Sequence, residues 1–236
     1  MFKCYSMKKI GIIGGLSAES TIEYYKIIVR EYNKIMGDSS SPLLVIDSLD
    51  LEELRSLAEE DKWEEVFKII YQSVKDLEKV RVELIILATN TIHKIFDKLK
   101  KKAKVPMISI MDATAEAIKK QNIKKVGLLG TIFTMQSDFY QNAFLKHNLE
   151  IIVPDQEDQE FVNKVIWEEL TYHILKPESK KCYLEVIERL REKGAEGIIL
   201  GCTEIPLLIQ QEDTQIPIFD TTSLHALAAL NFALSP

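Results

Sequence analysis

Cysteine and histidine are scarce in this chain: of its 236 residues, three are cysteine and four are histidine. The cysteines, Cys4, Cys182 and Cys202, lie far apart in the sequence, and an odd number of thiols cannot pair completely. Because disulfides persist mainly outside the reducing cytosol, we expect free thiols and a cytoplasmic protein. No Cys/His cluster has the spacing of a zinc site, so the sequence predicts no bound metal.

Long apolar runs and long basic runs are also missing. No apolar run approaches the roughly 20 residues of a membrane span, and the start of the chain has no apolar stretch of signal-peptide length. Acidic residues (36) outnumber Lys and Arg (30), which gives a net charge of −6. We therefore expect the chain to bind neither nucleic acids nor membrane surfaces. A strand-like pattern begins just after Met7, which makes Met7 a candidate for the native start in place of residues 1–6.

What the sequence does contain is an alternation of short apolar runs with long helical patterns. We expect strands at Lys9–Gly14, Leu43–Ile46, Leu84–Leu87, Met107–Ile110, Lys125–Leu129, Glu150–Val153, Gly197–Leu200 and Ile216–Phe219. Several of these runs are apolar throughout, which is typical of strands buried on both faces of a parallel sheet. Strand–helix alternation along the whole chain predicts an α/β fold.

One amphipathic helix is expected from Thr21 to Met36. Ser20 is its predicted N-cap residue, and Glu23, three residues later, would complete a capping box. No Pro/Gly/Ser-rich linker divides the chain into halves.

An internal repeat is the most informative pattern. The segment Lys8–Gly15 (KKIGIIGG) recurs as Lys124–Thr131 (KKVGLLGT), and Val82–Thr91 (VELIILATNT) recurs as Ala195–Glu204 (AEGIILGCTE). The first pair is offset by 116 residues and the second by 113. Apolar strands can resemble one another by chance, but the similar offsets favour two related α/β lobes with pseudo-twofold symmetry.

The repeat also sets the expected domain boundaries. Residues 7–111 together with residues 215–236 form the first lobe, and residues 112–214 form the second. In this scheme the last strand and helix, Ile216–Leu234, return to the first lobe.

Thr89 and Cys202 occupy equivalent places in the repeat, two residues beyond an apolar strand. In open parallel sheets, ligands bind beyond the carboxyl ends of the strands. Two facing lobes would therefore place one polar side chain on each side of a small molecule. That arrangement suits the removal of a proton from one face of a carbon and its return to the other.

Cys202 is the stronger of the two candidates. Gly201 allows a close backbone approach, and Thr203 with the following turn offers N–H groups at a helix start. A helix N-terminus favours a thiolate and lowers the pKa of a thiol below about 8.5. The alternative is an inert, buried cysteine at a strand end, which is the interpretation we give to Cys182 in the middle of a predicted helix.

The run Thr89-Asn90-Thr91 offers hydroxyl and amide groups at a strand end. Capping explains one or two of these residues, while all three together would suit a substrate carboxylate. His93 is more typical of a helix face than of a catalyst. The glycines between Gly11 and Gly15 do not have the dinucleotide-binding spacing, and no phosphate-binding loop motif follows them.

At these residues the sequence resembles the aspartate/glutamate racemase family. The resemblance rests on six motifs spread over nearly the whole chain: Gly14–Thr21 (GGLSAEST), Ser48–Asp50 (SLD), Thr89–His93 (TNTIH), Leu129–Thr131 with Thr134-Met135, Gly201–Ile205 (GCTEI), and Asp220–Thr222 with His225. It implies two lobes, each a four-stranded parallel sheet flanked by helices, with the active site between them. It also implies a homodimer and catalysis without pyridoxal phosphate, metal or any other cofactor.

The resemblance implies a division of roles among the motif residues. Thr89 and Cys202 would be catalytic, and the substrate would be bound by Ser17, Asn90, Thr91, Thr131, Thr134 and Thr203. Family members generally carry cysteine where this chain has Thr89; a branch with threonine there is associated with L-aspartate/L-glutamate racemisation. Arg55 and Thr171 fall near the places of the basic residues that many aspartate racemases use for the side-chain carboxylate.

The predicted function is therefore cofactor-independent racemisation of aspartate or glutamate, a small acidic amino acid being the partner molecule. Two alternatives remain at this point. One is a relative such as maleate isomerase, arylmalonate decarboxylase or hydantoin racemase; Ser17, Glu19 and Glu204 favour the amino-acid racemase over these. The other is a catalytically silent binder of acidic amino acids, motivated by the missing first cysteine.

Overall fold

The computed structural model describes residues 7–236, and their strands and helices alternate along the chain. The chain divides into two compact units: one comprises the residues up to Ser109 together with His225–Pro236, the other Ile110–Leu224. Each contains a four-stranded sheet in which all pairings are parallel. The α/β fold with two four-stranded parallel sheets is thus confirmed. No helix in the described part is long and apolar enough to cross a membrane.

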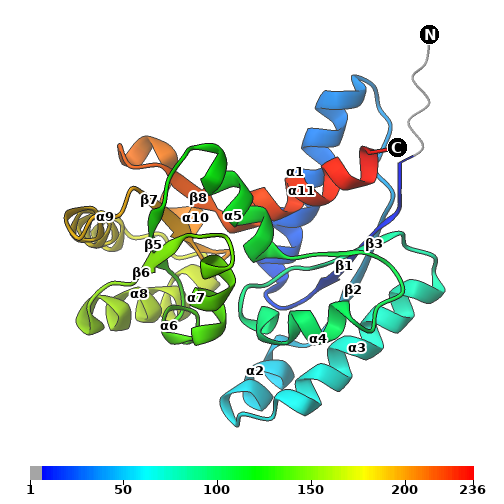
Figure 1. The fold of residues 1–236 in the computed structure, drawn as a ribbon, viewed down its shortest axis with the longest axis horizontal. Coiled ribbons are helices and arrows are strands. Elements are labelled where there is room, and N and C mark those ends of the chain that lie inside the picture. Colours follow the sequence, from blue (N-terminus) through cyan, green and yellow to red (C-terminus); the bar gives the residue numbers. More distant parts are fainter. Residues whose placement is uncertain (1–6) are drawn as a thin grey trace. The chain divides into compact units, whose positions relative to one another are not determined.

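The first sheet has the strand order β2-β1-β3-β4. Its strands are β1 (Ile10–Gly14), β2 (Leu44–Ser48), β3 (Leu84–Leu87) and β4 (Met107–Ile108). The helices of this unit are α1 (Ala18–Met36), α2 (Leu51–Glu59), α3 (Trp63–Lys79), the 3₁₀ helix η1 (Thr91–Ile95), α4 (Phe96–Lys100) and most of α11 (Thr221–Leu234). Figure 1 shows α1 and α11 on one side of this sheet and α2, α3 and α4 on the other.

The continuous apolar runs have the cause that the sequence predicted: both faces of the sheet are covered. In β3, Leu84 and Ile86 belong to the cluster packed against α1 and α11. Ile85 and Leu87 belong to the cluster packed against α2, α3 and α4. Successive side chains of a strand point to opposite faces, so burial on both sides requires every residue to be apolar.

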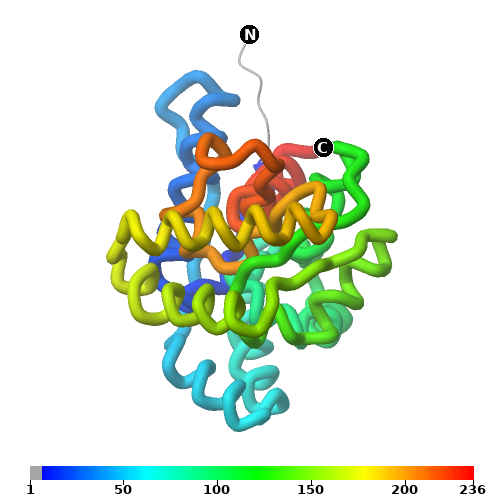
Figure 2. The backbone as a smooth tube through the Cα atoms, turned by 90° about the vertical axis from the view of Figure 1, so that its left-hand side faces the viewer, coloured from blue at the N-terminus to red at the C-terminus, as the bar shows by residue number. Residues whose placement is uncertain are grey.

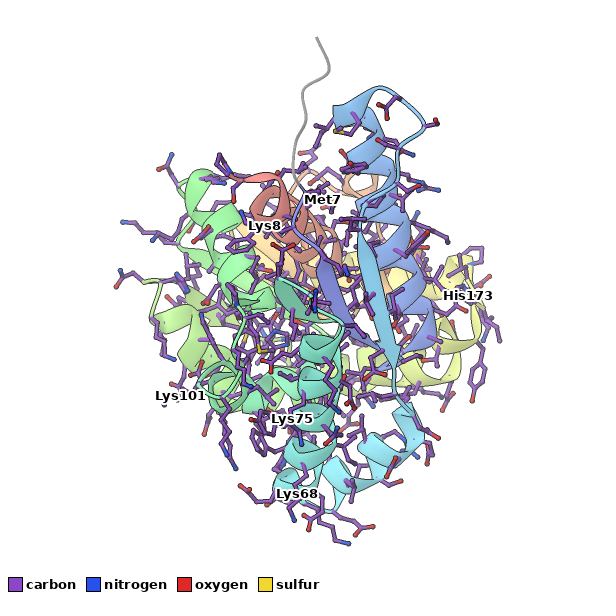
Figure 3. The ribbon with its side chains drawn as sticks, turned by 90° about the vertical axis from the view of Figure 1, so that its right-hand side faces the viewer. Met7, Lys8, Lys68, Lys75, Lys101 and His173 are labelled. Atoms are coloured by element: carbon purple, nitrogen blue, oxygen red, sulfur yellow. The ribbon has the colours of Figure 1, made fainter. Side chains whose placement is uncertain are left out.

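Helix α3 shows the complementary pattern of a helix that covers a sheet on one side only. Val66, Ile70 and Val74, spaced four residues apart, are buried. Lys68 and Lys75 are exposed along the same helix (Figure 3). Residues four apart share a helix face, which is why this spacing directs one face to the core.

The second sheet has the order β6-β5-β7-β8. Its strands are β5 (Lys125–Leu129), β6 (Glu150–Ile152), β7 (Gly197–Leu200) and β8 (Ile218–Asp220). Its helical segments are α5 (Ile110–Lys120), α6 (Ile132–Gln136), α7 (Asp138–Leu145), α8 (Gln156–Glu168), η2 (Leu170–Tyr172), α9 (Pro177–Glu192), α10 (Ile205–Leu208) and η3 (Gln211–Asp213). Helices α8 and α9 contact each other and lie side by side, yellow-green and yellow in Figure 2.

Equivalent hydrogen bonds recur in the two sheets. The Glu83 N–H donates to the Lys9 carbonyl (2.8 Å), and the Glu196 N–H donates to the Lys125 carbonyl (2.8 Å). The side chains repeat the match: the Glu83 carboxylate accepts from the Lys9 N–H (2.9 Å), and the Glu196 carboxylate from the Lys125 N–H (3.0 Å). The internal repeat is therefore structural, since chance similarity of apolar strands would not reproduce individual contacts.

The structure corrects the expected place of the last strand. β8 pairs with β7 in the second sheet and does not return to the first. Its contacts match those of β4: the Ile85 N–H donates to the Pro106 carbonyl (3.0 Å), and the Ile198 N–H to the Pro217 carbonyl (2.8 Å). Because β8 is the fourth strand of the repeat, only the end of the chain, from His225, joins the first unit.

The start of α1 also differs from the expectation. The N-cap is Ser17, whose side chain accepts from the Ser20 N–H (3.3 Å), so the helix begins at Ala18 and not at Thr21. The predicted capping box of Ser20 with Glu23 is wrong. Ser17 and Ser20 are both good capping residues, and the turn after β1 decides which of them occupies the cap.

Candidate active site

The turn that follows β1 shapes one edge of the first sheet. Gly15 has a left-handed backbone (φ +76°), and a Cβ there would lie 2.1 Å from the Leu49 carbonyl oxygen, so only glycine fits. The Gly15 N–H donates to the Thr21 hydroxyl (2.8 Å), which donates to the Ser17 carbonyl (3.0 Å). Ser17 is thereby held at the mouth of α1, at the carboxyl end of β1.

Thr89 lies two residues beyond β3, and both its backbone N–H and its backbone carbonyl are hydrogen-bonded. Thr89 and Asn90 are buried, whereas Thr91 is partly exposed. The Thr89 N–H donates to the Leu87 carbonyl (2.9 Å), and the Thr89 carbonyl accepts from His93 Nδ1 (2.6 Å). Because β1 and β3 are neighbours in the sheet, the threonine segment shares one sheet edge with the N-terminus of α1.

His93 lies in η1, as a helix-face residue should, and its ring belongs to a buried aromatic cluster. Its ring stacks on Phe96 (centroids 4.8 Å apart) and meets the ring of His225 edge-on (5.9 Å). His225 in turn contacts the Tyr24 hydroxyl through Nδ1 (2.8 Å) and the Ile108 carbonyl through Nε2 (2.9 Å). Burial is the main cause that lowers the pKa of His93 to about 3 and that of His225 to about 4. Both rings are neutral at neutral pH.

The second sheet carries a thiol and a carboxylate beyond the end of β7. Cys202 lies two residues past the strand and is partly exposed, and its S–H donates to Glu204 Oε2 (2.9 Å). The Thr203 hydroxyl donates to the same oxygen (2.9 Å). Glu204 is only 5% exposed. A buried carboxylate in contact with a thiol can accept the thiol proton, so the pair is equipped for base chemistry.

The pKa of the Cys202 thiol is raised well above its usual value, which corrects the thiolate expected from the sequence. Burial is the largest cause, followed by the negative charge of Glu204 and the hydrogen bond to it. The helix that was expected to favour the thiolate, α10, has four residues and begins only after Glu204. So short a helix offers little dipole, whereas burial and an adjacent anion both disfavour the charged sulfur.

Two predicted substrate contacts, Thr131 and Thr134, lie at the start of α6, just after the neighbouring strand β5. Thr131 accepts the Thr134 N–H (3.3 Å), and the two hydroxyl oxygens are 3.2 Å apart. The Gly201 N–H donates to the Leu129 carbonyl (2.7 Å), and a Cβ on Gly201 would lie 3.1 Å from that oxygen. Glycine therefore lets the ends of β5 and β7 approach closely, and both threonines share the sheet edge with Cys202.

The two residues considered for a substrate side-chain carboxylate already have partners. The Arg55 guanidinium binds Glu52 through Nε and Nη2 (3.0 and 2.7 Å) and Glu59 through Nη1 (2.6 Å). The Thr171 hydroxyl donates to the Ile166 carbonyl (2.7 Å). The Arg55 cation is therefore already paired with carboxylates of the protein, and the Thr171 hydroxyl is already bonded to the backbone.

Glu204 is a candidate functional residue whose contact with Cys202 was not predicted from the sequence. The sequence motifs used Glu204 only to mark the family and to favour an amino-acid racemase over its relatives, although an acid two residues after a strand-end cysteine is a usable signal. Cys182 lies on α9, as expected. Within residues 7–236, no group of three or more His, Cys, Asp or Glu is placed to hold a metal ion.

The chain matches the Asp/Glu/hydantoin racemase family over residues 13–229. The match spans both strand ends described above, including Thr89 and Cys202. The chain belongs to this family, which confirms the resemblance drawn from the sequence motifs.

Three relatives place the chain within the family. An aspartate racemase homologue from Pyrococcus horikoshii is 41% identical, with a TM-score of 0.86, over 97% of this chain and 100% of its own. An aspartate racemase from Picrophilus torridus is 27% identical, with a TM-score of 0.77, over 95% of this chain and 94% of its own. A broad-specificity amino-acid racemase from Bacillus subtilis is 27% identical over 96% of this chain and 98% of its own.

Proposed function

We propose that this protein interconverts the L and D forms of aspartate or glutamate by removing the Cα proton on one face and returning it on the other. The observation that carries the proposal is the hydrogen-bonded pair of Cys202 and Glu204 at the end of β7, in a chain of a racemase family. The reaction uses no pyridoxal phosphate and no metal. Homologues named as aspartate and amino-acid racemases support the assignment.

On the face of the substrate that Cys202 serves, proton transfer begins from a neutral thiol. The S–H proton of Cys202 passes to the Glu204 carboxylate, and the resulting thiolate takes the Cα proton of the substrate. In the reverse direction the thiol returns its proton to the carbanion and Glu204 hands a proton back. A raised thiol pKa fits this role, because a stronger base is needed for so weak an acid as Cα–H.

On the opposite face, Thr89 serves as the second acid–base group. A threonine hydroxyl is a poor base without an activating neighbour, but it can deliver a proton when another group resupplies one. Thr89 and Cys202 must then reach opposite faces of the same carbon. The substrate-binding groups of the proposal are Ser17, Asn90, Thr91, Thr131, Thr134 and Thr203, which hold the carboxylate while charge develops on it.

The experiment is Cα exchange in deuterated water. The protein is incubated with L-aspartate and, separately, L-glutamate, and NMR follows loss of the Cα proton while chiral chromatography follows inversion. Cys202→Ser should lower both rates by orders of magnitude with an unchanged circular dichroism spectrum. Cys182→Ser is the matched control and should behave as the wild type. Near-normal turnover of Cys202→Ser would contradict the assignment.

A broader substrate range is the second candidate. Arg55 is engaged by two glutamates and Thr171 by a backbone carbonyl, and one relative is a broad-specificity amino-acid racemase. A panel of neutral and acidic L-amino acids in the same exchange assay separates the two. Exchange confined to aspartate or glutamate supports the narrow enzyme, whereas comparable exchange of neutral amino acids supports the broad one.

The same assay tests the remaining interpretations. A silent binder of acidic amino acids would show a thermal shift with aspartate or glutamate but no Cα exchange, and a family relative with other substrates would show neither. The family resemblance further supports a homodimer, which sedimentation equilibrium would detect as twice the 27.1 kDa chain mass. The odd number of cysteines supports a reducing, cytoplasmic location, which cell fractionation would test.

A further inference from the structure

The peptide groups on both sides of Thr89 are held by buried side chains from other parts of the first unit. The carbonyl of Ala88, just before Thr89, accepts from the Ser20 hydroxyl of α1 (3.3 Å). The carbonyl of Thr89 itself accepts from His93 Nδ1 of η1 (2.6 Å). Ser20 and His93 are 2% and 3% exposed, so water does not compete for either bond. The backbone that carries the Thr89 hydroxyl is thereby clamped at two successive carbonyls.

His93 is itself oriented by neighbours. Its ring is stacked nearly parallel to that of Phe96 (interplanar angle 12°), which fixes the plane in which Nδ1 points. The edge of His225 packs against it at 73°. His225 is held in turn by Tyr24 of α1 and by the Ile108 carbonyl at the end of β4. A single packed chain of side chains thus connects α1, α11 and β4 to the carbonyl of Thr89.

The hydrogen bonds determine where the protons lie on both rings. A carbonyl oxygen only accepts, so Nδ1 of His93 carries the proton that it donates to Thr89. By the same reasoning Nε2 of His225 donates to Ile108, and its Nδ1 accepts from the Tyr24 hydroxyl. Burial lowers the pKa of both histidines. A neutral ring that donates from Nδ1 cannot use that nitrogen to take the hydroxyl proton of Thr89.

The second unit is organised differently at the equivalent place. There the polar neighbour, Glu204, contacts the reactive sulfur of Cys202 directly. The offset of 113 residues that relates Thr89 to Cys202 relates His93 to Pro206, which has no side-chain donor. One strand end therefore has a carboxylate hydrogen-bonded to the candidate catalytic side chain, and the other has groups that hold the backbone on both sides of Thr89.

We propose that His93, assisted by Ser20, is a positioning residue for the reaction: it fixes the Thr89 hydroxyl through the Thr89 backbone and takes no part in proton transfer. This inference rests on the proposed function, since it assigns how one of the two acid–base groups is placed. A misplacement of about 1 Å can cost about a hundredfold in rate, so the clamp accounts for two buried side chains that the chemistry itself does not use.

The kinetic test compares two substitutions of His93. His93→Asn keeps a donor near the position of Nδ1, whereas His93→Leu removes it. We expect His93→Leu to lower inversion by about a hundredfold while Cα exchange without inversion, driven by Cys202, survives. His93→Asn should recover much of the inversion rate, with the wild-type pH profile of kcat. His147→Asn is the control, because His147 lies just before β6, at the end of the second sheet opposite to the end that carries Cys202.

Three results would overturn the inference. Wild-type inversion in His93→Leu would show that the clamp is unnecessary. His93→Asn as slow as His93→Leu, together with loss of an inflection from the pH profile, would identify His93 as an acid–base group. If His93→Leu does not fold, Ser20→Ala, which removes only the weaker of the two bonds, replaces it; inversion and exchange falling together, or not at all, in that variant would also contradict the proposal.

A measurement without substrate keeps this inference separate from the proposed function. In ¹⁵N-histidine-labelled protein, NMR should show His93 as the neutral Nδ1–H form, unchanged between about pH 5 and 8. A ring that titrates in that range, or carries its proton on Nε2, would overturn the clamp whatever the activity. If the wild type catalyses neither exchange nor inversion while the spectrum is as expected, the proposed function fails and the geometry around Thr89 stands.

Discussion

Two strand-end residues, Thr89 and Cys202, have the same place in the repeat but opposite surroundings. Cys202 donates to a buried carboxylate, and its pKa is raised by burial and by that negative charge. Thr89 has neutral His93 bonded to its carbonyl. The two faces of the proposed reaction are therefore chemically unequal, and substitutions at each should have different signatures.

Glu204→Gln separates the charge of Glu204 from its shape. The amide removes the anion beside Cys202, so the pKa of the thiol should fall, which ultraviolet titration of the thiolate would detect. Despite this lower thiol pKa, turnover should fall about 10²- to 10⁴-fold, the range for losing a general acid–base group, because the amide cannot take up the thiol proton. Glu212→Gln, an exposed residue, is the control. Unchanged turnover in Glu204→Gln would remove Glu204 from the mechanism.

Substitution of Thr89 tests the second face. Thr89→Cys introduces a second thiol and should make the rates from the L and D enantiomers more alike, because both faces would then use the same kind of base. Thr89→Ala should slow racemisation while one enantiomer still exchanges its Cα proton through Cys202. Deuterium incorporation from each pure enantiomer measures both effects. Wild-type racemisation in Thr89→Ala would reduce Thr89 to a capping residue.

At the scale of the elements, the turn between β1 and α1 determines where the helix begins. Gly15 adopts φ +76° with the Leu49 backbone directly beside it, and this conformation places Ser17 at the N-cap. The sequence pattern predicted this helix and its end at Met36, but it placed the N-cap at Ser20, three residues after the observed cap, Ser17. Capping preference is local, whereas the turn is held by Thr21 and by contact with the segment after β2.

Gly15→Ala measures how strongly that turn is constrained. A left-handed backbone costs a non-glycine residue about 1–2 kcal/mol, and here the new Cβ would also overlap the Leu49 carbonyl, so the free energy of unfolding should fall by more than that. Gly37→Ala is a matched control, because Gly37 has φ +70° with open space around it and should lose only about 1–2 kcal/mol. Urea unfolding compares the two. Equal losses would show that the turn tolerates a side chain.

At the scale of the whole chain, stability should depend on pH through the two buried histidines. Folding lowers the pKa of His93 to about 3 and that of His225 to about 4, from an unfolded value of about 6.5. The unfolded state therefore binds protons first as the pH falls, and stability is lost below about pH 6.5 until the folded pKa values are reached.

The expected loss between pH 7 and pH 5 is about 2 kcal/mol for each histidine, since one pKa unit corresponds to about 1.4 kcal/mol. Urea unfolding at both pH values measures it. The double variant His93→Asn, His225→Gln keeps side-chain donors near the positions of Nδ1 and Nε2 but cannot titrate, so most of the dependence should disappear. The same slope in wild type and variant would assign the dependence to other groups.

Much of this molecule could be predicted from periodicity alone. Runs such as Leu84–Leu87 and Gly197–Leu200 have the bounds expected, because a strand covered on both faces has no polar position to blur its ends. The strand expected at Met107–Ile110 ends at Ile108, since Ile110 already begins α5. Short apolar segments beside a helix start carry too little pattern to place that boundary.

By itself, the sequence determined the α/β class, the repeated unit and the two equivalent strand ends, because these follow from local apolar patterns and from comparison of the chain with itself. Only the tertiary structure decided that β8 completes the second sheet, that Ser17 caps α1, that Cys202 is a neutral thiol held by Glu204, and that His93 lies buried beneath Thr89. The physical reason is common to all four. Strand pairing, turn geometry, burial and the charge beside a titrating group depend on neighbours that folding, and not sequence proximity, supplies.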